Sequence, residues 1–282
     1  MIKLIKHNGL PRFARNNKPF TVHHSQFTQL AFTLAETLIV IGILGVVAAL
    51  TLPNLNHATG DKETVTRLKK VHSTLNEAFD RAIATYGPLD EWQNTCGNTS
   101  EELAACTFKR ITEFLKVSKT CSNGDYDEET GDLDTANMES CTTSLDGWTD
   151  PYQSAAVLAD GTTFIVYDFY NPSCDENRWQ YKNICIDYIE VDINGKNKGK
   201  NQYGQDQFEF MVTKDSGIVP FIHFRNNTYA GVVSDCMSGK NFQCTFWVLE
   251  YENMDYLKAD NSGKCTDNPS ITLDGVTNTS CH

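Results

Sequence analysis

The chain has no cysteine pair at C-x-x-C spacing, no HExxH, no GxSxG and no phosphate-binding glycine loop. The first absence argues against zinc ribbons and thioredoxin-like redox sites, and the others remove common signatures of catalytic sites. Beyond residue 87 the only histidines are His223 and His282. Glu190 and Asp235 are imaginable as a general acid and base, but we expect them to be ordinary solvated acids. The sequence therefore predicts a protein that is not an enzyme.

Acidic residues are missing from the first 31 positions, which hold five basic side chains. Because the whole chain has a formal charge of −12, the remaining residues carry −17. Such an acidic body argues against a nucleic-acid partner, which needs a positive surface. Basic residues placed just before an apolar segment keep that end of a membrane protein in the cytoplasm. The five are Lys3, Lys6, Arg12, Arg15 and Lys18.

Cysteine is missing before residue 96, so all ten cysteines follow the apolar segment described next. An even number confined to one side of such a segment predicts five disulfides in an oxidising compartment. The sequence alone does not assign their connectivity. The candidates are Cys96, Cys106, Cys121, Cys141, Cys174, Cys185, Cys236, Cys244, Cys265 and Cys281.

Charge is almost missing from residues 31–52, where Glu36 is the only charged side chain. A helix of this length would span roughly 33 Å, which matches a bilayer core of roughly 30 Å. The run is too long for the apolar core of an ordinary signal peptide. We therefore expect a membrane helix that stays with the mature protein, although a glutamate there is costly.

An amphipathic helical pattern continues beyond Pro53 and ends at Gly87-Pro88. Pro53 is expected to kink the helix, and Gly60 marks a second weak point. The apolar stripe of this half needs a partner surface. Its members are Val65, Leu68, Val71, Leu75, Phe79, Ala82, Ile83 and Tyr86.

From about residue 90 the pattern changes to strands and loops. Asp160-Gly161, between two apolar runs, is typical of a hairpin turn. Further strands are expected at 185–193, 208–213, 219–224 and 244–251. The four tryptophans are expected to fill the core of this sheet domain.

The predicted fold class is α+β: a long N-terminal helix, half membrane-spanning and half amphipathic, packed on an antiparallel sheet domain with disulfide-rich loops. The expected domains are a basic cytoplasmic leader (1–31), a transmembrane helix (32–53), an amphipathic helix half (54–87) and a β ectodomain (88–282).

The segment from 191 to 210 is the one candidate metal site in the body. Asp192, Asn194 and Asp206 could supply oxygens to calcium, with Gly195 allowing a tight turn. Nearby lysines oppose a divalent ion, and the spacing is not that of an EF-hand. No cofactor is certain, calcium is one hypothesis, and a plain Asn-Gly turn between strands is the favoured interpretation.

The run FTLAETLIVIGILGVVAALTLP, residues 32–53, resembles the N-terminal signature of type IV pilins and type II secretion pseudopilins. That family has a basic leader, cleavage before Phe, a glutamate four residues later, an unbroken apolar run and a closing proline. Phe32, Glu36 and Pro53 match these positions. Two features depart from the pattern: Ala31 stands where the family usually has Gly, and the leader is long.

The resemblance implies that a prepilin peptidase cleaves between Ala31 and Phe32 and methylates the new amine. It implies that Glu36 pairs with the amine of a neighbouring subunit during assembly, which would repay the cost of burying its charge. Pro53 would be a flexible point in the helix. The implied partners are the peptidase, other pilin or pseudopilin subunits and an assembly platform in the bacterial inner membrane.

The resemblance also implies that the body lies in the periplasm before the chain enters a filament. It further implies a C-terminal loop closed by a disulfide between Cys265 and Cys281. The sequence does not decide between a pilin and a pseudopilin, or between a major and a minor subunit. One alternative is a single-pass anchored ectodomain that binds a partner and does not polymerise, and another is an anchored hydrolase. A simple anchor would keep its leader and tolerate Glu36→Leu.

Overall fold

The computed structural model of the chain forms two compact units, residues 1–52 and residues 53–282. Helix α1 (Leu34–Tyr86) contributes residues to both. The structure describes residues 34–97, 99–123, 134, 136–142, 153–167, 173–178, 180–222, 228–240 and 243–282, without the side chains of residues 49–59, 100, 101, 187, 239 and 240.

In the larger unit, α1 buries the stripe that the sequence predicts. Its members from Val65 to Ala82 are 7 % exposed or less, and Ile83 packs partly buried beside them. The helix includes Pro53 and ends as expected, because Gly87 adopts a φ of +87° that a side chain would disfavour. Ion pairs between residues four apart lie on the solvent face of the helix.

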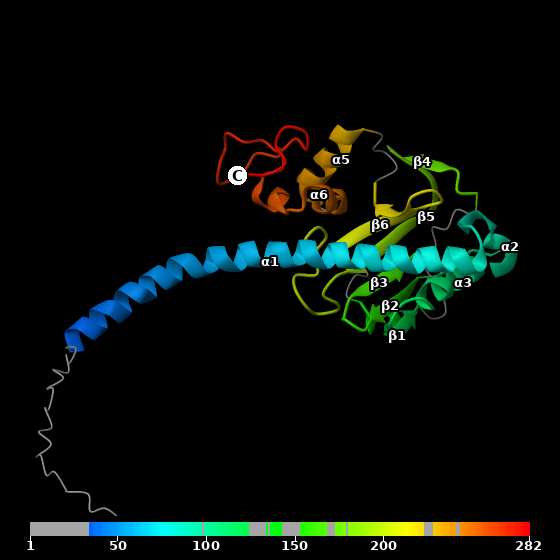
Figure 1. Cartoon of the computed structure of the whole chain (residues 1–282), viewed down its shortest axis with the longest axis horizontal. Coiled ribbons are helices and arrows are strands. Elements are labelled where there is room, and N and C mark those ends of the chain that lie inside the picture. Colours follow the sequence, from blue (N-terminus) through cyan, green and yellow to red (C-terminus); the bar gives the residue numbers. More distant parts are fainter. Residues whose placement is uncertain are drawn as a thin grey trace, which may run out of the picture. The chain divides into compact units, whose positions relative to one another are not determined.

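Within the described residues, seven strands form one antiparallel sheet in the order β1-β2-β3-β5-β6-β7, with β4 also pairing with β5 (Figure 1). The larger-unit part of α1 packs against one face, where Phe164, Phe208 and Phe210 join the helix stripe in a single core. The α+β class with an antiparallel sheet is thereby confirmed. The strands are β1 (Val117–Ser122), β2 (Ser154–Leu158), β3 (Thr163–Val166), β4 (Glu176–Arg178), β5 (Tyr181–Asp192), β6 (Gln207–Thr213) and β7 (Gly217–Pro220).

Short helices surround the sheet. Thr99 and Glu102 form a reciprocal capping box that starts α3. The helices are α2 (Gln93–Cys96), α3 (Ser100–Thr112), α4 (Ala136–Glu139), α5 (Tyr229–Asp235) and α6 (Cys244–Tyr251), with the single turns η1 (Leu89–Glu91), η2 (Cys236–Lys240) and η3 (Asp255–Lys258).

Most expected strands are present, but one prediction is wrong. The hairpin at Asp160-Gly161 and the strands at 185–193 and 208–213 correspond to β2–β3, β5 and β6, whereas β7 covers only the start of 219–224. Residues 244–251 form helix α6 instead of a strand. This apolar run is buried from Cys244 to Val248, so it has no polar face whose period separates a helix from a strand.

One edge of the sheet is closed by side chains of α1. The Ile218 N–H in β7 donates to Asn76 Oδ1 (2.9 Å), and His72 Nε2 donates to the Ile218 carbonyl (2.8 Å). These two side chains, one helical turn apart, therefore take the place of a further strand. Gly217 has a φ of +67°, and a Cβ there would lie 2.7 Å from Asn76 Oδ1. Pro220 also cannot donate to another strand.

The opposite edge, β1, is protected differently. Its pairing with β2 is irregular between Val117 and Lys119. Lys119 extends to Ser140, where its Nζ lies 2.7 Å from Oγ. A bulge and a lysine are both devices that discourage a strand from another chain.

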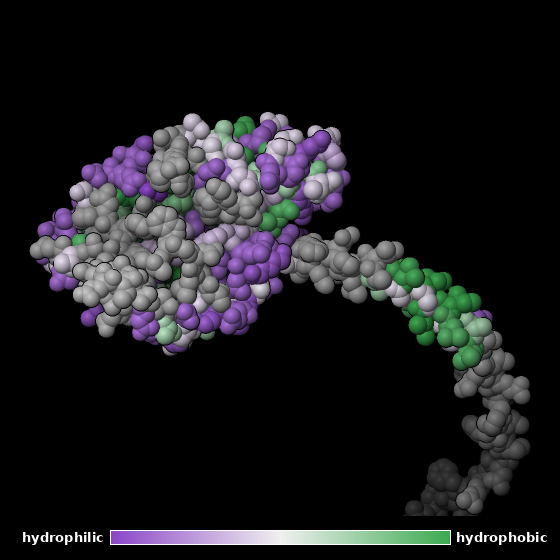
Figure 2. Space-filling view, turned by 180° about the vertical axis from the view of Figure 1, so that it is seen from behind, coloured by the Kyte–Doolittle hydropathy of each residue, from purple (hydrophilic) through white to green (hydrophobic). Residues whose placement is uncertain are grey.

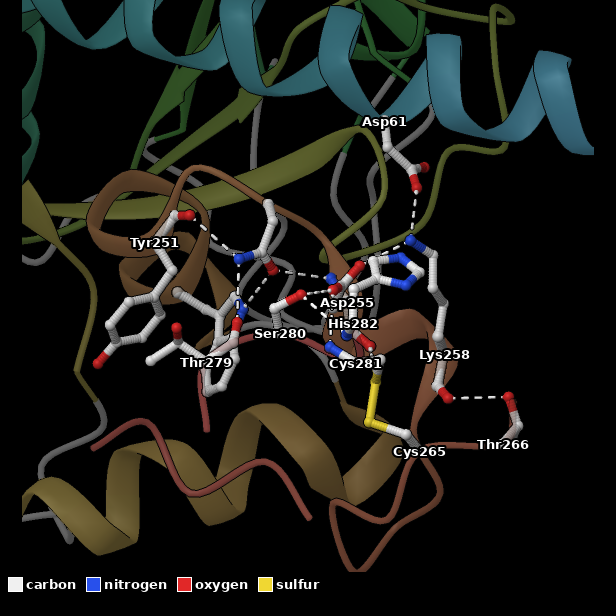
Figure 3. A network of polar contacts seen from close by, with 12 residues as sticks. Asp61, Tyr251, Asp255, Lys258, Cys265, Thr266, Thr279, Ser280, Cys281 and His282 are labelled. Atoms are coloured by element: carbon white, nitrogen blue, oxygen red, sulfur yellow. Dashed lines mark hydrogen bonds and ion pairs between the residues drawn. A yellow bond between two sulfur atoms is a disulfide. The ribbon is translucent and has the colours of Figure 1, made fainter. Parts of the chain in front are cut away.

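The C-terminal segment is fastened by one buried carboxylate (Figure 3). Asp255, 3 % exposed, accepts from Ser280 Oγ (2.6 Å) and from the Cys281 N–H (2.9 Å) through Oδ2. Its Oδ1 accepts from Lys258 Nζ (2.6 Å), which also lies 3.7 Å from Asp61 of α1. Asp255 therefore connects the end of the chain to α1 through Lys258.

All ten cysteines form disulfides, which confirms the prediction of five bridges. Each bridge joins one cysteine to the next along the chain, across 8 to 20 residues. The C-terminal pair is the one that the family resemblance implies. The bridges are Cys96–Cys106, Cys121–Cys141, Cys174–Cys185, Cys236–Cys244 and Cys265–Cys281.

We predict that Asn76→Ala destabilises the body by about 1–3 kcal/mol, because it leaves the N–H of the buried Ile218 without an acceptor. Urea unfolding of the full chain in detergent measures this. Ser73→Ala, at an exposed position of the same helix, is the control and should change stability by less than about 0.5 kcal/mol. Equal midpoints for Asn76→Ala and the unmodified chain would contradict the edge-closing role.

Candidate functional site

The first part of α1 exposes apolar side chains on every side; we call Leu34–Ala48 the apolar segment (Figure 2). Its large side chains are between 50 % (Val47) and 79 % (Leu34) exposed. Among the described residues of the body, only Leu257 and Val276 are comparable. A helix that is apolar all round belongs in a core, a membrane or an assembly, so this segment requires a cover. The exposed set is Leu34, Leu38, Ile39, Val40, Ile41, Ile43, Leu44, Val46 and Val47.

Glu36 lies in the first turn of α1, inside this apolar segment. A negative charge in a first turn is favoured by the helix dipole and by the unsatisfied N–H groups there. Apolar cover would remove water from the carboxylate, and the charge would then need a cation close by. The arrangement thus suits a contact in which a positive group meets the start of the helix.

Two of the sequence-predicted processing and assembly residues, Ala31 and Phe32, lie outside the described residues. Pro53 lies within α1, and its side chain is also outside the description. Over the part of the chain that the structure describes, no helix combines the length and the apolar character needed to cross a bilayer. The membrane helix at 32–53 stays a prediction.

The three predicted calcium ligands meet in the loop between β5 and β6. Asp192 Oδ1 accepts from the N–H groups of Asn194 (3.1 Å) and Gly195 (2.8 Å), and Gly195 has a φ of +83°. This is a side-chain-stabilised turn, as the favoured interpretation of the sequence has it. Asp206 accepts from the N–H groups of residues 200, 201 and 202 and lies 3.4 Å from Asn194 Nδ2.

Two oxygens of this loop keep the calcium hypothesis open. Asp192 Oδ2 and Asn194 Oδ1 are buried without a hydrogen-bond partner, and both are ligands that calcium accepts. Burial raises the pKa of Asp192 to about 6. However, the described residues contain no group of three or more His, Cys, Asp or Glu arranged to hold a metal. Calcium binding stays a prediction.

Two buried glutamates form a cluster that the sequence analysis missed. Glu190 in β5 and Glu209 in β6 are cross-strand partners, 0 % and 2 % exposed. The expectation that Glu190 is solvated is therefore wrong. The available signal was an acid inside an apolar run in each strand, because apolar neighbours on both sides indicate a strand buried on both faces.

Tyrosine hydroxyls satisfy part of this cluster. Tyr167 and Tyr203 each donate to Glu190 Oε2 at 3.0 Å, and Tyr188 donates to Glu209 Oε1. Burial raises the pKa of Glu209 well above its ordinary range, although the Tyr188 hydroxyl lowers it. Glu209 Oε2 is buried without a hydrogen-bond partner. Burial therefore opposes ionisation of Glu209, whereas the hydroxyl that donates to it favours the ionised form.

The chain matches no family model, no curated protein and no solved structure. Its function is therefore inferred from its own residues and contacts, with the apolar segment as the principal candidate site.

We predict that Glu209→Gln flattens the pH dependence of stability. Because the pKa of Glu209 is raised in the folded state, its contribution is fully present below about pH 4.3 and is lost as pH rises toward the folded pKa. The glutamine variant should therefore gain stability relative to the unmodified chain as the pH rises above about 4.5, by at most about 1.4 kcal/mol per pH unit.

Urea unfolding at several pH values measures this difference. Glu250→Gln, which changes an exposed acid of α6, is the matched control and should keep a constant difference from the unmodified chain. Parallel pH curves for Glu209→Gln and the unmodified chain would show that Glu209 ionises normally in the fold.

Proposed function

We propose that the chain is a pilin-like structural subunit. It is processed before Phe32, N-methylated and assembled into a type IV pilus or a type II secretion pseudopilus. The observation that carries this proposal is the apolar segment: nine large apolar side chains at least half exposed, with one carboxylate in the first helical turn. Its work is assembly through that segment, without turnover of a substrate.

Charge and cysteine distribution support the route that the proposal needs. The leader is basic, so it stays in the cytoplasm while residues 32–53 enter the inner membrane. The five disulfides of the body support an oxidising compartment, and the periplasm is the compartment that the proposal assigns to the body. A prepilin peptidase removes the leader and methylates the new N-terminus, and an assembly platform extracts the subunit into the filament.

Glu36 provides the register in this proposal. Cleavage before Phe32 creates an α-amine four residues before Glu36 in the sequence, and the amine of a neighbouring subunit is the cation that this carboxylate meets. A carboxylate under apolar cover is strongly destabilising without such a partner, so unaligned helices are disfavoured. The pairing therefore selects staggered helices over arbitrary association.

The body offers few other surfaces for association between chains, which supports assembly through the helix. Asn76 and His72 cover one sheet edge, and the irregular β1 edge resists pairing. Exposed large apolar side chains of the described body are limited to Leu257 and Val276. The body is then best suited to the outside of the filament, where its acidic surface faces water.

We predict that co-expression with a prepilin peptidase yields an N-terminal peptide that starts at Phe32 and carries one methyl group on its amine. Mass spectrometry of the purified chain detects it. Ala31→Gly restores the usual residue of the family and should be cleaved at least as fast. A chain that still begins at Met1, beside a control substrate that is cleaved, would leave a membrane-anchored ectodomain as the better account.

We predict that Glu36→Gln leaves this cleavage intact and reduces incorporation into filaments by at least about tenfold, because the amide removes the charge that meets the amine. Pelleting of sheared filaments followed by immunoblotting measures incorporation. Glu77→Gln removes an acid elsewhere on α1, one that pairs at the exposed surface with Arg81, and should assemble normally. Equal loss in both variants would argue against a specific role for Glu36.

A further inference from the structure

Four basic residues lie in three segments of the body that adjoin the turn between β2 and β3, Lys116 being placed there by its backbone and as an exposed side chain. We call Arg67, Lys70, Lys116 and Lys198 the basic patch. Lys70 Nζ lies 2.7 Å from Asp160 Oδ2, and the carbonyl of Lys116 accepts from the N–H of Ala159 (2.8 Å). A Cβ placed on Gly161 would lie 3.8 Å from Lys198 Nζ. Sequence reasoning did not find this patch, because its members are up to 131 residues apart (67 to 198).

A pocket of about 280 Å³ opens within the basic patch, between α1 and the β2–β3 turn. Two cations stand at its wall, and Val71 and Ile193 give it an apolar part. This combination suits a group with a short aliphatic stem and an anionic end. The lining residues are Arg67, Lys70, Val71, Asp160, Thr162 and Ile193.

Among the described residues, the charges of the patch are only partly compensated. Arg67 pairs with Glu63 and Lys70 with Asp160, at positions 40 % exposed or more. Among the described residues, no ion pair includes Lys116 or Lys198. Exposed pairs contribute little and exchange readily, so all four cations can meet an outside anion.

We propose that the basic patch binds an acidic side chain, aspartate or glutamate, of a second copy of this chain. The proposal rests on the proposed function, because it names the contact between bodies that accompanies helix packing. The charge balance favours this occupant: beyond residue 31 the chain carries −17, so neighbouring copies repel unless a positive site faces an acidic one. Asp160 already shows how a carboxylate meets Lys70 at the pocket.

Zero-length cross-linking tests the contact directly. Full-length chains labelled with ¹⁴N and ¹⁵N are mixed before assembly and treated with a carbodiimide, which joins lysine amines to carboxylates that they touch. Mass spectrometry separates links between copies from links within one. We expect mixed-isotope links from Lys70, Lys116 or Lys198 to Asp or Glu, and few from the exposed Lys264.

Charge reversal provides the second measurement. Lys116→Glu combined with Lys198→Glu should weaken assembly by about tenfold, because the two added acids repel the acidic side chain of the second copy. Lys109→Glu combined with Lys264→Glu is the matched control, since it makes the same change of net charge at two exposed lysines away from the pocket. Equal effects of the two double variants would overturn the proposal.

The outcomes separate this inference from the proposed function. Mixed-isotope links elsewhere with none from the patch would overturn the inference and leave filament assembly standing. A processed chain that forms no filaments in the pelleting assay would refute self-assembly, and the inference with it; filaments without links from the patch would overturn the inference alone. Vesicle binding through anionic lipid that Lys116→Glu with Lys198→Glu abolishes, without links between copies, would assign the patch to lipid and overturn the proposal.

Discussion

The burial of one stripe of α1 against the sheet is the contact on which the rest of the body depends. Leu68, Leu75 and Phe79 are at most 1 % exposed and share a core with the inner face of the strands. Without this helix that sheet face would be open to water, and the β7 edge would lack its covering side chains. The same helix also receives Lys258 from the C-terminal segment. The helix thus covers one face of the sheet, closes the β7 edge and holds the C-terminal segment.

Two halves of one helix therefore have opposite requirements. The half in the body has a narrow apolar stripe and charged residues on its other face, so a single partner surface satisfies it. The apolar segment has no polar face, so one surface of its own chain would not satisfy it. This difference in pattern is the physical basis for assigning folding to one half and assembly to the other.

Sequence reasoning succeeded where the information is local. The stripe from Val65 to Ala82 has helical spacing, and Gly87-Pro88 and Asp160-Gly161 carry their own backbone preferences, so the structure confirms all three. It failed where partners distant in sequence decide. Residues 244–251 are apolar throughout, and only the surrounding layer makes them a helix.

The candidate sites also differ in whether they depend on local sequence or on contacts between distant residues. Glu36 was found because a lone charge in an apolar run is visible in the sequence itself. The burial of Glu190 depends on its pairing with Glu209 in another strand, and the edge closure depends on Asn76 meeting Ile218, 142 residues away. The pattern of a single sequence does not show which distant residues are in contact. The strand register and the packing of the helix on the sheet therefore become known only from the structure.

The disulfides of the body connect segments that are close in sequence. Each one joins neighbouring cysteines, so its loop of 8 to 20 residues can close before strands distant in sequence meet. A bridge across about 15 residues contributes roughly 3 kcal/mol by restricting the unfolded chain. The bridges thus restrict loops locally, whereas the long-range contacts of α1 fix the sheet. A body held in these two ways can keep its fold while the apolar segment exchanges one cover for another, as the proposed passage from membrane to filament requires.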